Sequence, residues 1–187
     1  MKIVKDDHRV TLRQWHAGLQ DKRALRASLR HSKTVTEACL SEGFRSLLMQ
    51  THSLWRSDAQ EWRFTALAIT AALAAHVKSI DERQTFATQL GQMMGNKPVM
   101  SELRFSRLSA VKTADELLRQ LLRAVRLLNG TVNLPSLAED IFYWCRENDE
   151  LQNHIRRQQR PTECIRVRWA MEYFQAGDAG SDNNNEQ

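Results

Sequence analysis

The chain has 187 residues and a formal net charge of +5, and its length predicts one domain that buries its own hydrophobic core without disulfide or metal cross-links. The N-terminus lacks an apolar signal segment, the longest apolar run is too short to span a bilayer, and the three cysteines form no CxxC pair. We therefore expect a soluble, cytoplasmic protein without a zinc cluster or a disulfide framework.

Helices are predicted along the whole chain. It contains only three prolines and seven glycines, it is rich in alanine, leucine, arginine and glutamine, and runs of β-branched residues are nearly absent. This composition predicts an all-α fold, a compact helical bundle of roughly eight to ten helices in one body or in two closely packed lobes. In chain order, helices are expected over residues 9–18, 21–31, 36–54, 59–76, 81–93, 101–109, 113–128, 134–146, 147–157 and 161–176.

Helix-end signals divide the chain. Thr113 and Glu116 have the spacing of a capping box, Pro135 occupies a position where first-turn prolines are tolerated, and Gly130 and Gly177 stand where helices stop. No repeat or Pro/Gly/Ser-rich linker interrupts the body. We predict a single helical domain over residues 1–176, followed by a disordered acidic tail over residues 177–187.

Three arginine-rich clusters follow one another along the chain. The first includes Arg23, Arg26 and Arg30, which share one helix face and have only Asp21 nearby. The second extends from Arg104 to Arg126 on two predicted helices. The third surrounds Pro161 and contains Arg156, Arg157, Arg160, Arg166 and Arg168.

The presence or absence of an acidic partner one helical turn away distinguishes an ordinary solvated arginine from one on a functional surface. Asp115 and Glu116 lie one turn before Arg119, so that arginine has helix partners, whereas Arg123 and Arg126 have no acid one turn away. An unpaired row repels itself and gains most from an outside anion, and guanidinium groups match phosphate oxygens bidentately. Nucleic-acid contact is therefore predicted at Arg23, Arg26, Arg30, Arg104, Arg107, Arg119, Arg123 and Arg126.

Catalytic signatures are missing from the sequence. There is no P-loop, dinucleotide fingerprint or nucleophile elbow, and the six histidines have no metal-ligand spacing. We predict no catalytic residue, no metal and no cofactor. Trp169 and Tyr173, four residues apart on one helix face, are interpreted as core or subunit interface, so contact with the nucleic-acid backbone is favoured over base reading.

Taken together and in order, these segments resemble the CasB family, the small subunit of the Cascade complex in type I-E CRISPR systems. The resemblance covers roughly residues 12–176 and is carried by Trp15 and Leu19, the arginine-rich stretch 23–30, the alanine-rich stretch 66–75, the distinctive stretch 101–108, the arginine–leucine stretch 117–128, the residues Leu137, Asp140, Ile141 and Trp144, and the closing stretch 168–174.

The resemblance implies a non-catalytic subunit of a crRNA-guided complex. It implies two copies lying head to tail beside the backbone subunits and the large subunit, with basic residues that hold the displaced non-target DNA strand and so stabilise the R-loop. Whether the phosphates belong to single-stranded DNA or to crRNA stays open. Two alternatives remain: a free-standing helical DNA-binding regulator, and a scaffold whose arginines pair with acidic partner surfaces. A catalytic role ranks last.

Overall fold

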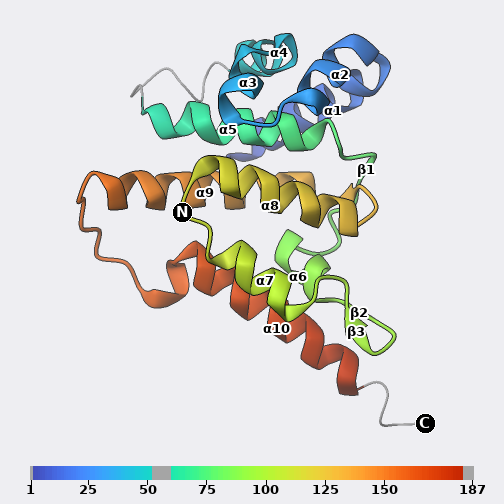
Figure 1. Cartoon of the computed structure of the whole chain (residues 1–187), viewed down its shortest axis with the longest axis vertical. Coiled ribbons are helices and arrows are strands. Elements are labelled where there is room, and N and C mark those ends of the chain that lie inside the picture. The colour runs from blue at the N-terminus through green and yellow to red at the C-terminus, as the bar shows by residue number, and fades with distance from the viewer. Residues whose placement is uncertain (1, 52–59, 183–187) are drawn as a thin grey trace.

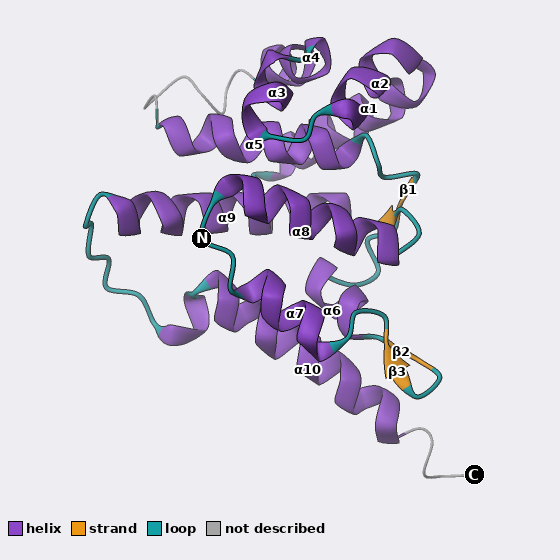
Figure 2. Cartoon of the chain, in the orientation of Figure 1, coloured by secondary structure: helices purple, strands orange, loops and turns teal. Residues whose placement is uncertain are grey.

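The computed structural model describes residues 2–51 and 60–182, and these residues form an all-α protein, as predicted. They contain ten α-helices, one 3-10 helix and four strands of two residues each. Figure 2 shows how little of the chain is extended. No described helix is long and apolar enough to cross a membrane.

The first helices form the upper part of the molecule in Figure 1. They are α1 (Asp6–Asp21), α2 (Arg23–His31), α3 (Val35–Leu40) and α4 (Glu42–Gln50). The single helix predicted over residues 36–54 is wrong, because Ser41 is extended and its hydroxyl accepts a hydrogen bond from the Phe44 amide at 3.1 Å. Ser41 thereby caps a new helix. Residues 52–54 of that prediction lie outside the described residues.

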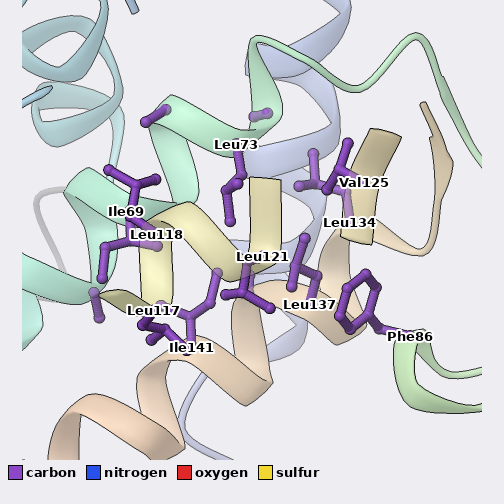
Figure 3. Close-up of a cluster of buried hydrophobic side chains, with 14 of the residues drawn as sticks. Ile69, Leu73, Phe86, Leu117, Leu118, Leu121, Val125, Leu134, Leu137 and Ile141 are labelled. Atoms are coloured by element: carbon purple, nitrogen blue, oxygen red, sulfur yellow. The ribbon is translucent and has the colours of Figure 1, made fainter. Parts of the chain in front are cut away.

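The core lies between α5 (Glu61–Ala74), α8 (Ala114–Leu127) and α9 (Leu134–Gln152). Figure 3 shows Leu73 of α5, Leu121 of α8 and Leu137 of α9 meeting there. From Ala66 to Ala74 every residue of α5 is buried, as expected of a helix that is apolar on all sides. The predicted break between residues 146 and 147 is wrong, because α9 is continuous and Arg146 pairs with Glu150 across it at 3.8 Å.

The lower part of the molecule is formed by α6 (Phe86–Gly91), α7 (Glu102–Ser109) and α10 (Ile165–Asp182), which follows a 3-10 turn, η2 (Pro161–Glu163). Two stacked rings join α7 to α10, since the centroids of Phe105 and Tyr173 are 4.0 Å apart. The predicted helix end at residue 176 is wrong. Gly177 does not stop α10, because it lies inside the helix and beside the backbone of Gly91. Residues 177–182, predicted as tail, are thus helical, and residues 183–187 lie outside the described residues.

The helix predicted over residues 81–93 is too long at both ends, because only Phe86–Gly91 is helical (α6), residues 81–85 form a loop and Met93 begins a strand. β1 (Ser79–Ile80) pairs in parallel with β4 (Thr131–Val132), and β2 (Met93–Met94) forms a hairpin with β3 (Lys97–Pro98). The first pair begins where the Lys78 amide donates to the Gly130 carbonyl at 2.8 Å. Gly130 ends α8 as predicted, with a φ of +79° that favours glycine. This pairing holds the C-terminal ends of α5 and α8 together.

Candidate nucleic-acid interface

Four arginines from two helices line one surface hollow of about 390 Å³. Arg104 and Arg107 come from α7, and Arg123 and Arg126 from α8, with Met100, Gln120 and Leu127 completing the lining. No carboxylate occurs among these residues. We call this feature the arginine hollow.

Local sequence explains why the arginines face outward there. The capping box predicted at the start of α8 is present, with the Glu116 amide donating to the Thr113 hydroxyl at 3.2 Å. On α8 the buried residues are Leu117, Leu118, Leu121, Ala124 and Val125. Their burial leaves Arg119, Arg123 and Arg126 exposed, and burial of Phe105 and Leu108 leaves Arg104 and Arg107 exposed on α7.

The first arginine cluster meets the second at His76, which follows α5. Arg26 and Arg30 of α2, together with Arg126 of α8, all lie close enough to His76 to lower its pKa. Arg26 is half-buried, and its Nε donates to the Ala75 carbonyl at 3.1 Å. Because Arg126 also lines the hollow, the two clusters come near each other at His76. We call this group the arginine band: Arg26, Arg30, Arg104, Arg107, Arg123 and Arg126, with His76 between its two parts.

Two of the eight predicted residues lie outside this band. Arg23 is exposed at the first position of α2 and lines neither the hollow nor the surroundings of His76. Arg119 is exposed one turn before Arg123 and stays near Glu116. The backbone amides of Lys112 and Thr113 lower the pKa of that carboxyl most, and the Arg119 charge adds to their effect. Asp115, the other acid one turn before Arg119, accepts a hydrogen bond from the Val35 amide at 2.8 Å, so a helix ion pair at Arg119 stays a prediction.

Three of the five arginines of the third cluster are engaged by groups of the protein itself. Arg168 pairs with Asp140 at 2.6 Å, Arg157 pairs with Glu150 at 2.6 Å, and the Arg166 guanidinium donates to the Val111 carbonyl at 2.8 Å. These groups are already neutralised or hydrogen-bonded, so they offer little to an outside anion.

Sequence reasoning missed His76 and the hollow's other lining residues. Nothing near His76 in the sequence points to Arg30 or Arg126. Gln120 lies one turn before Arg123, so the helical spacing that singled out the arginines also marks it. His52, another of the six histidines without metal-ligand spacing, lies outside the described residues.

The pKa of His76 depends on the three arginines that lie near it. Burial lowers it from 6.5 to about 4, with Arg30, Arg126 and Arg26 adding to the effect in that order, while a hydrogen bond to the backbone of Arg30 opposes it. We expect Arg126→Ala to raise the pKa of His76 in an NMR titration, and Arg119→Ala to leave it unchanged. Equal values in the wild type and both variants would show that Arg126 is remote from His76.

The same shift fixes the sign of a pH effect on stability. The neutral form of His76 is favoured in the folded state, so its contribution is fully present above pH 6.5 and is lost as the pH falls toward 4. The free energy of unfolding should therefore fall over this range, and less steeply in His76→Gln. Identical pH dependence of chemical denaturation in the two proteins would contradict the shift.

Other chemistry has little support on the described surface. No group of three histidine, cysteine, aspartate or glutamate side chains is placed to hold a metal ion among residues 2–51 and 60–182. Burial raises the pKa of Asp140 to about 7, but its carboxylate already faces Arg168. This pair connects α9 to α10.

Comparison with known proteins gives one match. Residues 25–174 match the family model described as CRISPR-associated protein Cse2. No curated protein and no solved structure matches the chain. The matched range includes every residue of the arginine band.

Proposed function

Since the match over residues 25–174 shows that the chain belongs to the Cse2 family, the CasB family of type I-E Cascade, we propose a role for its arginine band. In this role, the Cascade small subunit binds the backbone of the displaced DNA strand through the band. Binding at this surface stabilises the R-loop during antiviral defence.

The arginine hollow is the observation that carries this proposal. Four exposed guanidinium groups converge there without a carboxylate in the lining, and like charges held together are unfavourable until an anion joins them. Beyond Arg126, Arg30 and Arg26 lie near the same histidine, His76. A strand that follows the band meets successive cationic groups, which suits a chain of phosphates better than a single small anion.

The energetics of R-loop formation give such contacts their importance. An RNA–DNA hybrid is about as stable as the DNA duplex that it replaces, so protein contacts to the backbone decide the balance. Phosphate contacts carry no sequence information, and a subunit that must accept any target needs none. Contacts without sequence information therefore favour the Cascade small subunit over a site-specific DNA-binding regulator.

Within the complex we propose the partners that the family implies. These are the backbone subunits, the large subunit and a second copy of the chain placed head to tail. The crRNA is the alternative source of phosphates for the same surface. We propose a structural role for the subunit and assign it no catalytic step.

The proposal is tested in the assembled complex. Complexes carrying the wild-type subunit or the Arg123→Ala/Arg126→Ala double variant are bound to a target duplex, and dissociation of the R-loop is followed after adding competitor. We expect the variant to enter the complex normally and its R-loops to dissociate faster, with the difference shrinking at high salt.

Arg45→Ala/Arg156→Ala is the matched control. Both arginines are exposed and lie outside the band, and the net charge changes equally. Equal R-loop lifetimes for the wild type and the band variant would favour a scaffold whose arginines face other proteins. Equal shortening by the two double variants would assign the effect to net charge alone.

A further inference from the structure

The arginine hollow combines features that a simple phosphate cradle does not need. Met100, with 2% of its surface exposed, and the half-buried Leu127 are the two apolar residues of the lining, beside the four arginines. The volume of about 390 Å³ lies within the range of roughly 300–1,000 Å³ typical of pockets for organic ligands. A lining that combines apolar and cationic side chains fits a ligand with an apolar face and attached negative charge.

The backbone of Met100 is held in place by hydrogen bonds at both its amide and its carbonyl. The Met100 amide donates to the Leu90 carbonyl at 3.0 Å, and the Tyr173 hydroxyl donates to the Met100 carbonyl at 2.5 Å. Tyr173 also stacks on Phe105, which lies between Arg104 and Arg107 on α7. These contacts fix Met100 and Phe105 before a ligand enters, which lowers the conformational entropy lost on binding at this side of the hollow.

The lining chemistry suits a nucleobase. Guanidinium planes stack on bases as aromatic rings do, and the half-buried Leu127 offers an apolar surface to a base face. The Gln120 side chain presents both a donor and an acceptor, so it can meet polar edges of different bases. One amide does not select a sequence, which agrees with a subunit that accepts any target.

We propose that the arginine hollow takes up one unstacked nucleobase of a single strand while the arginines around it bind the flanking phosphates. This inference rests on the proposed function, because it names how the displaced strand is held. A paired base in duplex DNA must first leave its stack to enter. The hollow thereby makes the band selective for single strands, which charge alone does not provide.

The test compares strands with identical phosphates and different bases. Binding of the full-length protein to a thymine oligonucleotide and to the same backbone with abasic sites is measured by fluorescence anisotropy. We expect the abasic strand to bind at least about fivefold more weakly, on the scale of base stacking in single-strand-binding proteins. Equal affinity for the two strands would overturn the base site and leave backbone binding intact.

Truncation of the Leu127 side chain offers a second comparison. Leu127→Ala should reduce the preference for the intact strand without changing affinity for the abasic one. Leu122→Ala is the matched control, since Leu122 is half-buried on the same helix but does not line the hollow. Loss of preference in both variants, or in neither, would contradict the assignment. If the wild type binds neither strand, the proposed function fails together with the base site.

Discussion

Replacing Arg26, Arg30, Arg123 and Arg126 with Ala in one protein should lower its affinity for single-stranded DNA by up to about three orders of magnitude at 0.1 M salt. Each phosphate contact on a single strand contributes about 0.7 to the log–log salt slope. Four contacts therefore contribute up to about 2.8 logarithmic units at 0.1 M salt, relative to 1 M. Fluorescence anisotropy with a mixed-sequence oligonucleotide measures the loss.

Two comparisons keep this result specific. Arg119→Ala should reduce the affinity much less than Arg123→Ala, because Arg119 lies near Glu116 and outside the hollow. A variant that retains Arg26 checks for structural damage, since Arg26 also donates to the Ala75 carbonyl. If the four-arginine variant keeps its fold and its affinity falls by less than about threefold, the band is no major phosphate-binding surface.

Gly91→Ala should unfold the protein more easily than any single arginine change. A Cβ at residue 91 would lie 2.1 Å from the Tyr173 carbonyl oxygen and 2.9 Å from its Cα. These are backbone atoms of α10, so relief requires α6 and α10 to separate. Overpacking of this kind typically costs about 1–3 kcal/mol and occasionally more, and with backbone on both sides we expect about 3 kcal/mol or more.

Gly18→Ala provides the matched control for this change. Gly18 lies in α1, and a Cβ there would meet no other atom within 4 Å. Replacing a helical glycine with alanine should stabilise the protein by up to about 1 kcal/mol. Chemical denaturation of both variants measures the difference. If Gly91→Ala unfolds at the wild-type midpoint, the close crossing of α6 and α10 is wrong.

Local patterns predicted the helices that carry the site. The apolar stripe, the Thr113–Glu116 capping box and the exposed arginines of α8 all depend on residues within a few turns of one another. The boundaries failed where tertiary packing prevails over local signals. Gly177 continues a helix beside Gly91, and the backbone of β1 pairs with β4, which lies about fifty residues later.

The same limit applies to the choice of arginines. In the sequence the third cluster resembles the other two, because the partners of Arg168 and Arg157, Asp140 and Glu150, lie beyond one helical turn. Conversely, Arg30 and Arg126 both come near His76, where the pairing of β1 with β4 joins the chain after α5 to the chain after α8. The hollow also needs Met100, which the β2–β3 hairpin delivers beside α7.

Photo-crosslinking in the assembled complex tests most directly whether the band lies along the displaced strand. A benzophenone side chain is introduced in place of Arg119, which is exposed beside the hollow and one turn from Arg123. The complex is then bound to a target in which each DNA strand and the crRNA carry different labels. Adducts with the displaced non-target strand are the predicted result. Adducts only with protein subunits would contradict nucleic-acid binding at this surface, and adducts only with crRNA would contradict its assignment to the displaced strand.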